Sequence, residues 1–358
     1  MKTLSAGRSA RRALARPDAQ AKPDRIRTVF RHLLLLIPAG VIFNLLLTAS
    51  TTDFGAVFVH QRVALDYLIL AVLLGFVPWF THALRLRVWT RFLGARIPLH
   101  DLFSMVIGTE LGSAITPTAF GGGYVKLGML VERGLSVGAA ASLMTLGSVE
   151  DGVFFAFAIP VALVTSVQAP VGLARFATII STRGPHIVMA TCCAVVGAWI
   201  ILTRGRKNPV ARRVGAAWSD CAGVYRLIAR RGKTRLLATL TLTAIQWACR
   251  YSVVSALLAS FSIRVDPSRF FVLQWVVFTL GVFVPSPGAA GGLEAAFMLV
   301  HRGLIPESLL GLMTAGWRLL TFYLQLSVGS LVFGVLRVRS DTSPNVKPES
   351  GLVAPVQP

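Results

Sequence analysis

Apolar runs of about 17 to 25 residues recur along this chain, and no other feature limits its fold as strongly. Such a run lets one helix cross the hydrocarbon of a bilayer, which is ~30 Å thick. Only 14% of the residues are charged, against about 25% in a soluble domain, which is too few to cover a water-facing surface. A β-barrel would instead show short segments of alternating polarity. The sequence therefore predicts an all-α, polytopic helical membrane bundle.

Basic residues outnumber acidic ones, with 36 Lys and Arg against 15 Asp and Glu, and the net charge is +21. They gather in the tails and loops between the apolar runs. In a membrane protein this pattern is typical of cytoplasmic loops, which follow the positive-inside rule and attract anionic lipid head groups. We therefore expect membrane lipids as partners and no nucleic acid.

The apolar segments divide the chain into one domain and two tails. Residues 1–31 are expected to form a disordered basic cytoplasmic tail, residues 32–338 a single transmembrane domain, and residues 339–358 a disordered Pro-rich cytoplasmic tail. We expect about six to eight transmembrane helices in the domain. The segments lie near residues 32–50, 64–83, 100–116, 122–131, 137–167, 186–203, 236–261, 270–284, 290–300 and 308–336.

Charged loops orient these segments. The 84–98 loop carries four Lys or Arg residues and the 204–235 loop carries ten, so we expect both loops and both termini in the cytoplasm. The segments between them must then cross the membrane an even number of times. Residues 100–131 and 270–300 meet this condition as re-entrant hairpins that enter from opposite faces. Full crossings by all four arms would also meet it, but 122–131 and 290–300 are too short to span the hydrocarbon.

A Pro- and Gly-rich break lies at the tip of each proposed hairpin. Two broken hairpins of opposite orientation indicate an inverted repeat, and paired breaks of this kind point to the binding site of a transporter. The alternative is that the small residues only permit kinked helices to pack closely. The residues concerned are Pro117, Gly121, Gly122 and Gly123 in the first break, and Pro285, Pro287, Gly288, Gly291 and Gly292 in the second.

Seven ionisable residues fall inside apolar segments, where each costs roughly 2.5–3.5 kcal/mol at the bilayer centre. Such residues pair with one another or line a wet cavity. The three basic groups could nearly neutralise the four acidic ones. The candidates are Glu110, Lys126, Glu150, Asp151, Arg250, Glu294 and Arg318.

Two of these residues follow a glycine break directly. Glu294 either caps the N-terminus of a half-helix or acts as a gate or counter-ion facing Arg250 or Arg318. Lys126 follows the first break, where a cation opposes the helix dipole and is suited to contact an anion such as a lipid phosphate. Arg318 lies too deep in its segment to reach the interface, so we expect it to be paired, whereas Arg250 could reach the interface by snorkelling.

The basic 204–235 loop contains apolar residues at helical spacing, including Val214, Trp218 and Tyr225. This pattern predicts an amphipathic helix in the cytoplasmic interface, or a docking site for a partner. The four cysteines and six histidines form no recognisable cluster, so neither a metal site nor a cofactor is expected.

The segment Pro285–Glu294, PSPGAAGGLE, resembles the P-x-P-G-G-x-G-x-x-E signature of the lysylphosphatidylglycerol synthase transmembrane-region family. Arg318 with Tyr323 is similar to a downstream stretch of that family, and Pro117, Gly121, Gly122, Lys126 and Glu150-Asp151 resemble its first-half pattern. The resemblance covers most of residues 30–338. Where the family often has Gly-Glu after the first break, this chain has Gly123-Tyr124, so an acidic role there is not implied.

The resemblance implies a flippase-like membrane protein. The 358 residues contain no counterpart of the cytosolic aminoacyl-transfer domain, so we expect lipid movement and no lipid aminoacylation. The predicted function is translocation of a polar or anionic lipid between leaflets of the bacterial inner membrane, with no enzymatic activity. Lys126 and Arg318 would neutralise the head group, while Glu294 and Glu110 gate the path.

Two other functions remain open from the sequence. One is an intramembrane enzyme that acts on a lipid or polyprenyl phosphate, with Glu150, Asp151 or Glu294 as acid or base, although no known metal or nucleophile motif is present. The other is an accessory subunit that docks through the 204–235 helix. A homo-oligomer or a membrane partner is compatible with either.

Overall fold

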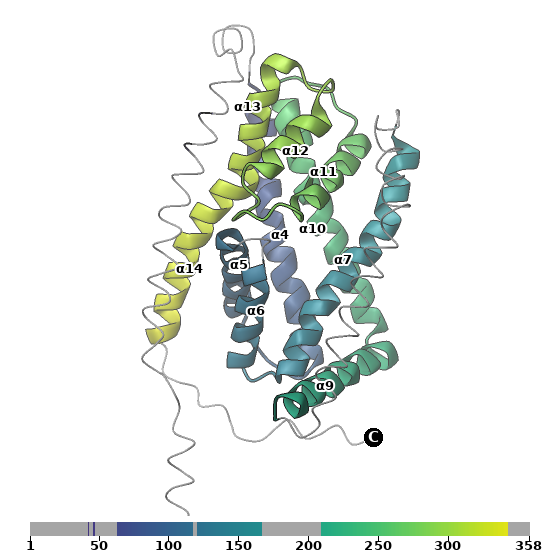
Figure 1. Ribbon diagram of the computed structural model, residues 1–358, viewed down its shortest axis with the longest axis vertical. Coiled ribbons are helices and arrows are strands. Elements are labelled where there is room, and N and C mark those ends of the chain that lie inside the picture. Colours follow the sequence, from purple (N-terminus) through teal and green to yellow (C-terminus); the bar gives the residue numbers. More distant parts are fainter. Residues whose placement is uncertain (1–41, 43–45, 47–62, 117–119, 167–208, 343–358) are drawn as a thin grey trace, which may run out of the picture.

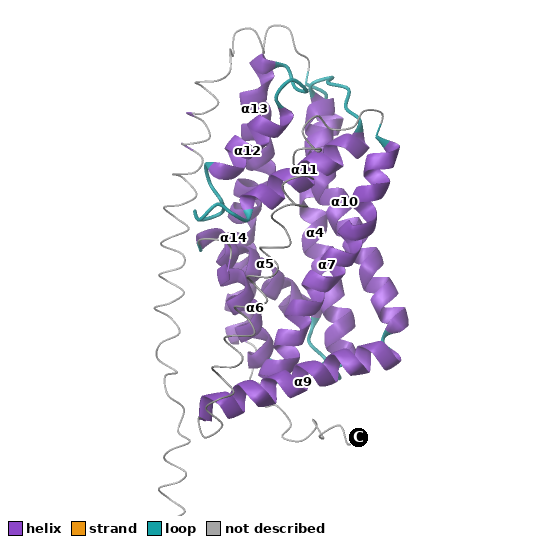
Figure 2. Ribbon diagram, turned by 45° about the vertical axis from the view of Figure 1, so that its right-hand side comes forward, coloured by secondary structure: helices purple, strands orange, loops and turns teal. Residues whose placement is uncertain are grey.

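The computed structural model describes residues 42, 46, 63–116, 120–166 and 209–342, and every regular element in these ranges is a helix (Figures 1 and 2). The predicted all-α class is therefore confirmed. Within the described residues, three helices are long and apolar enough to cross a membrane: Leu65–Phe92, Val137–Thr165 and Glu307–Val335. The tail 1–31, the segment near 186–203, Pro117, and the segment near 32–50 apart from residues 42 and 46 lie outside the described residues.

Helices α4 (Leu65–Phe92) and α10 (Lys233–Ser260) pack along each other through the centre of the bundle (Figure 1). The predicted loop at 84–98 is wrong over its first part, because α4 continues to Phe92. Arg85, Leu86 and Trp89 are buried in this last part of the helix. Arg85, one of the four basic residues counted in this loop, therefore lies in the interior, where it forms ion pairs with Glu150 and Asp151.

The first break separates α5 (Leu99–Ile115) from α6 (Phe120–Glu132), which pack antiparallel. The second separates α11 (Pro267–Gly281) from α12 (Gly292–His301), which also pack together. The helix breaks thus occur where the sequence predicts them. At 1.5 Å per residue, α6 and α12 are each shorter than the ~30 Å of hydrocarbon. The two hairpins lie toward opposite ends of the bundle (Figure 1); re-entry from opposite membrane faces stays a prediction.

The remaining helices frame these hairpins. Helix α7 (Val137–Thr165) packs against α6, α10 and α11. Helix α13 (Glu307–Arg318) continues through a π-helical turn, η1 (Leu319–Tyr323), into α14 (Leu324–Thr342). Residues 339–342, predicted to begin a disordered tail, therefore form the last turn of α14.

The amphipathic helix expected within 204–235 is present as α9 (Pro209–Arg231). It lies across one end of the bundle (Figure 2) and packs against α7 and α10. Contact with α7 is close, because a Cβ at Gly138 would lie 2.4 Å from the carbonyl oxygen of Ala217. Trp218 is 70% exposed on the other side of the helix, which leaves an apolar face for the interface.

Two hydrophobic clusters form the core, and each contains one hairpin. The first surrounds Leu102, Ile107 and Leu130 from α5 and α6. The second surrounds Phe270 and Phe297 from α11 and α12. Each hairpin is therefore anchored in its own half of the bundle, with its tip directed toward the other half (Figure 1).

Candidate functional site

The charged candidates of the sequence analysis balance in number once Arg85 is added, apart from a further buried carboxylate, Asp101, which pairs with Arg133. All seven candidates lie in the bundle interior or line its cavity, together with Arg85, which the sequence analysis assigned to a loop. Four acidic groups therefore face four basic groups. The acidic residues are Glu110, Glu150, Asp151 and Glu294, and the basic residues are Arg85, Lys126, Arg250 and Arg318.

Arg85 ties α4 to α7 and α10. Its guanidinium donates two hydrogen bonds to Glu150 Oε2, at 2.7 and 3.0 Å, and one of 3.2 Å to Asp151 Oδ1. It also donates to Gln246 Oε1 at 3.1 Å and to the carbonyl of Gly147 at 3.2 Å. All donor groups of this buried cation are thereby used, which makes the network a structural clamp rather than an open site.

Neighbouring side chains donate further hydrogen bonds to the two carboxylates of this network. Glu150 Oε1 accepts from Trp89 Nε1 at 2.8 Å and from the hydroxyl of Thr239 at 2.5 Å. Asp151 Oδ1 accepts from Trp247 Nε1 at 3.0 Å. The adjacent carboxylates of Glu150 and Asp151 thus share Arg85, although they point in different directions along α7.

Lys126 is buried in α6, with its Nζ 3.0 Å from His82 Nε2 on α4. An ammonium group can only donate, so His82 Nε2 is the acceptor and the imidazole is neutral. Glu110, Glu150 and Asp151 lie within electrostatic range of the Lys126 charge. The cation is therefore partnered inside the protein in this conformation.

Glu294 and Arg318 form a second buried ion pair. Arg318 Nε donates to Glu294 Oε1 at 2.7 Å, and the side chains of Arg318 and Glu294 are only 3% and 2% exposed. Arg318 Nη2 also donates to the carbonyl of Gly288 at 2.7 Å, so it holds the tip of the second hairpin. The expected pairing of Arg318 is confirmed, and of the two interpretations of Glu294 the structure shows the counter-ion.

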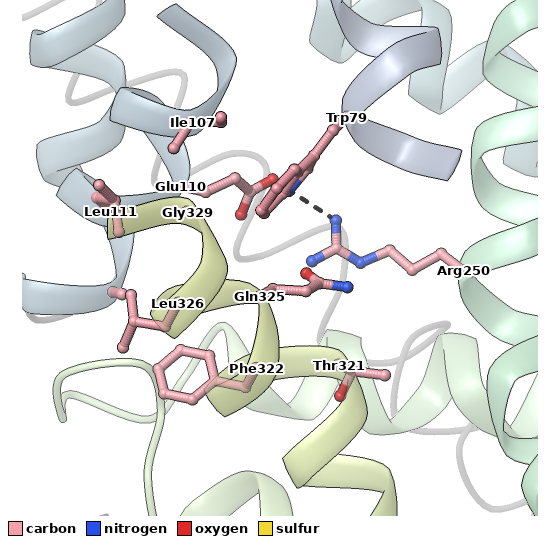
Figure 3. Close-up of a pocket in the computed structure, with 11 residues that line it drawn as sticks. Trp79, Ile107, Glu110, Leu111, Arg250, Thr321, Phe322, Gln325, Leu326 and Gly329 are labelled. Atoms are coloured by element: carbon pink, nitrogen blue, oxygen red, sulfur yellow. Dashed lines mark ion pairs between the residues drawn. The ribbon is translucent and has the colours of Figure 1, made fainter. Parts of the chain in front are cut away.

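A cavity lies where the tip of the first hairpin approaches η1 and α14 (Figure 3). Glu110 and Arg250 face each other across it, with 3.8 Å between Glu110 Oε1 and Arg250 Nη1. These side chains are 37% and 20% exposed, far more than those of the Glu294–Arg318 pair. The remaining walls come from Trp79, Ile107, Leu111, Ala114, Thr321, Phe322, Gln325, Leu326 and Gly329.

The Arg250 guanidinium is held between aromatic rings as well as beside Glu110. It lies 5.8 Å from the centroid of Trp247 and 5.7 Å from that of Phe278, within the range of cation–π attraction. Arg250 therefore points into the bundle and does not need to reach the interface. The ion pair with Glu110 consists of one N···O contact of 3.8 Å, so either side chain can change its contacts at low cost in free energy.

Glycines of the first break serve close helix packing. A Cβ at Gly121 would lie 2.7 Å from the carbonyl oxygen of Gly112, and one at Gly122 would lie 2.4 Å from that of Thr109. Gly123 is less constrained, with Met144 Cε at 3.1 Å from the Cβ position. For Gly121 and Gly122 the structure therefore agrees with the alternative interpretation, that small residues permit the helices to pack closely.

Glycines of the second break serve the backbone turn. Gly288 and Gly291 have φ of +60° and +80°, which residues with a side chain rarely adopt. A Cβ at Gly292 would lie 2.4 Å from Val284 Cγ2. Pro285 and Pro287 lie in the same linker between α11 and α12, where neither interrupts a helix.

Sequence reasoning missed several members of the site. Arg85 was counted with a loop, although Leu86 and Trp89 continue the apolar pattern of α4 beyond it. Phe322 connects the two halves: it lines the cavity with Leu111, and its ring lies under Gly288. No sequence pattern marks Phe322 as different from other aromatic residues in an apolar run.

Comparison with known proteins agrees with this architecture. The model of the family described as "Lysylphosphatidylglycerol synthase TM region" matches residues 32–329. A UPF0104 membrane protein of Archaeoglobus fulgidus is 22% identical over 287 residues, which cover 76% of this chain and 87% of that protein. The matched region contains both hairpins and all eight interior charges. The chain therefore belongs to the lysylphosphatidylglycerol synthase TM region family of membrane proteins.

Proposed function

We propose that this protein moves a polar or anionic lipid between leaflets, and that the head group passes through the cavity between Glu110 and Arg250. The observation that carries the proposal is the looseness of this pair. It is the one interior pair that combines a 3.8 Å separation with exposed side chains in the described residues. A head group can exchange with such a partner, whereas Arg85 and Arg318 are held by several hydrogen bonds.

The cavity offers contacts suited to a lipid phosphate or hydroxyl. Arg250 supplies a fixed cation, and the Trp79 indole N–H on the wall has no hydrogen-bond partner among the described residues. Gln325 donates to the carbonyl of Gly75 at 2.6 Å and can offer its amide oxygen. Acyl chains would remain in the bilayer, so only the head group requires this polar surface.

The closed cavity is too small for a phospholipid head group. The volume open to water-sized molecules is about 40 Å³, enough for a few waters. Transport therefore requires an opening motion, and the second hairpin is the element placed to make it. Its tip is joined to Arg318 and Phe322, and Phe322 forms part of the cavity wall. The positive φ angles of Gly288 and Gly291 allow this linker to turn sharply.

Lys126 and Arg318 play indirect roles in this proposal. Both are partnered in the closed conformation, by His82 and Glu294, so they would meet a head group only after the hairpins move. The basic residues Arg230 and Arg231 at the end of α9 support a cytoplasmic location for that end of the bundle, in a bacterial inner-membrane protein with both termini inside.

Reconstitution tests the proposal directly. Purified protein in vesicles of phosphatidylethanolamine and phosphatidylglycerol should accelerate the transbilayer movement of a fluorescent phosphatidylglycerol over protein-free vesicles. Arg250→Gln should lower that acceleration about tenfold, because the head group loses a charged partner. Arg226→Gln is the matched control, since Arg226 on α9 is exposed and remote from the cavity. Equal rates for wild type and protein-free vesicles would refute the proposal.

A further inference from the structure

Several buried polar atoms near the second hairpin have no hydrogen-bond partner among the described residues. They are the two amide atoms of Gln274, Glu294 Oε2, His301 Nε2, Trp317 Nε1 and the hydroxyl of Tyr323. Each of these side chains belongs to a residue that is at most 2% exposed. Buried polar atoms in proteins nearly always bind another protein atom or an ordered water. Their concentration in one region therefore points to a ligand, and ordered water is the usual partner of such atoms.

Two of these residues, Glu294 and His301, lie on one face of α12. Glu294, Phe297 and His301 are spaced by three and four residues, so they share that face over two helical turns. Helix α11 runs beside them: Phe270 contacts His301 at 5.3 Å between ring centroids, and Phe278 contacts Trp317 at 5.8 Å.

Gln274 is one turn from each of these two α11 residues, and Trp317 stacks on Phe297 at 4.7 Å. Gln274 and the Trp317 indole therefore lie at the level midway between His301 and Glu294. These residues thus lead from the end of α12 to the ion pair at the hairpin tip, and we call their unpartnered atoms the file.

His301 marks the end of this file nearest to water. Its Nδ1 is 2.8 Å from the carbonyl oxygen of Phe297, and because a carbonyl only accepts, Nδ1 carries the proton. Nε2 is then a bare acceptor that faces the interior. The next residue, Arg302, is exposed and pairs with exposed Glu307 at 3.7 Å, so the file begins directly below a charged surface.

We propose that water molecules bound along this file conduct protons from the Arg302 end of the bundle to Glu294. The proton adds to Glu294 Oε2, the carboxylate becomes a neutral carboxylic acid, and no electron is transferred. Arg318 keeps its charge and loses its counter-ion, so the Glu294–Arg318 pair and the grip of Arg318 on Gly288 weaken together.

Among the described residues Arg318 is the charged group in contact with Glu294, and it favours the ionised carboxylate until a proton arrives. On α13 Glu294 faces Arg318, and in η1 the Tyr323 hydroxyl lies within electrostatic range. Helix α11 contributes the neutral amide of Gln274. Helix α10, which packs behind α11 and α13, contributes Tyr251 against Phe278, while its Arg250 is engaged at the cavity. Arg318 is therefore the counter-charge that protonation releases.

Released Arg318 would act on the transport cavity. Its guanidinium lies 4.4 Å from the ring centroid of Phe322, which is part of the cavity wall. An uncompensated cation there would attract an anionic head group, so proton entry and head-group binding would be coupled. This coupling rests on the proposed function, whereas the proton file does not.

Infrared spectroscopy of the full chain in vesicles tests the file. Acidification should produce the carbonyl band of a buried carboxylic acid, and Glu294→Gln should remove it. After transfer to D₂O this band should shift quickly in the wild type and about tenfold more slowly in Gln274→Met, which keeps the side-chain length and removes its hydrogen bonds. Thr314→Val is the control, because the buried Thr314 hydroxyl bonds only within its own helix.

Two results would overturn the inference. One is that no carboxylic acid band depends on Glu294 at any pH where the protein stays folded. The other is that the band shifts in D₂O as fast in Gln274→Met as in Thr314→Val. Near-ultraviolet circular dichroism establishes that each variant is folded. In the same vesicles, lipid movement should rise with acidification in wild type and lose this dependence in Glu294→Gln. If no lipid moves but the band behaves as expected, the proposed function fails and the proton file stands.

Discussion

Arg250 and Glu110 face each other at 3.8 Å across a cavity whose wall includes helix α5 of the first hairpin. The ion pair of Arg318 with Glu294 differs in separation and burial, at 2.7 Å and almost without exposure. Both pairs join the same kinds of charge, so the chemistry of the groups does not distinguish them. Burial and hydrogen bonding distinguish them. The Glu110–Arg250 pair can exchange its partners, whereas the Glu294–Arg318 pair holds the hairpin.

This contrast predicts different stability effects for the Arg85 clamp and the cavity pair. Glu150→Gln should lower the free energy of unfolding by about 3–5 kcal/mol, because Arg85 would stay buried with part of its charge unpaired. Glu110→Gln should cost ~1 kcal/mol or less, since that pair is long and exposed. Denaturation in mixed micelles measures both. Equal losses would contradict the division into a structural network and an exchangeable pair.

Close packing within the first hairpin predicts a sharp difference between two glycines of α6. Gly122→Ala should destabilise the protein by about 1–3 kcal/mol, because the new methyl group would meet Ser113 Oγ and the carbonyl of Thr109. Gly128→Ala meets nothing within 4 Å and should be neutral or stabilising by up to ~1 kcal/mol, through helix propensity. Thermal unfolding compares them, and a Gly122→Ala protein as stable as Gly128→Ala would argue against tight packing.

Much of the architecture could be predicted because membrane helices leave strong local signals. The breaks beside Gly121 and Gly292 interrupt helices in the structure as in the sequence. Boundaries set by charge were less accurate: Arg85 was assigned to a loop because a count of basic residues does not show which of them have buried partners. Pairing depends on helix packing, so the match of Glu110 with Arg250, 140 positions away, had no local signal.

The structural reason for each glycine was harder still to predict. Gly122 and Gly288 look alike in the sequence, yet one permits a close helix contact and the other a positive φ. Only the backbone separates these reasons. The unpartnered atoms of Gln274 and His301 were equally hidden, since an isolated polar residue in an apolar run usually bonds to its own helix.

The predicted location of α9 at the cytoplasmic interface can be tested with thiol labelling. Trp218→Cys, in a chain whose Cys192, Cys193, Cys221 and Cys249 are changed to Ala, should react with a membrane-impermeant maleimide only in inside-out vesicles. Trp218 is exposed, so the new thiol should react quickly. Labelling only in right-side-out vesicles would reverse the predicted orientation.

The native thiol on the same helix should react more slowly. Burial raises the pKa of Cys221 above its ordinary value. At neutral pH a smaller fraction of the Cys221 side chains is then in the reactive thiolate form than for a thiol of ordinary pKa. The labelling rate should rise as the pH increases toward the pKa of Cys221. A chain that keeps Cys221 as its single thiol, labelled over a pH series beside the Trp218→Cys chain, measures the difference. Identical pH profiles would show that Cys221 is not shielded.

The contact between Gly288 and Phe322 predicts a pair of compensating substitutions. Gly288→Ala should destabilise strongly, because a Cβ would lie 2.3 Å from Phe322 Cζ at a backbone φ of +60°. Phe322→Ala in the same chain removes the clash but leaves the strain of the left-handed conformation, about 1–2 kcal/mol.

Gly291→Ala is the control, since its φ is +80° but nothing lies within 4 Å, so it should show the backbone strain alone. A double-mutant cycle of unfolding free energies therefore separates clash from strain. If the effects of Gly288→Ala and Phe322→Ala simply add, the hairpin tip does not rest on the cavity wall, and movement of that tip could not open the cavity.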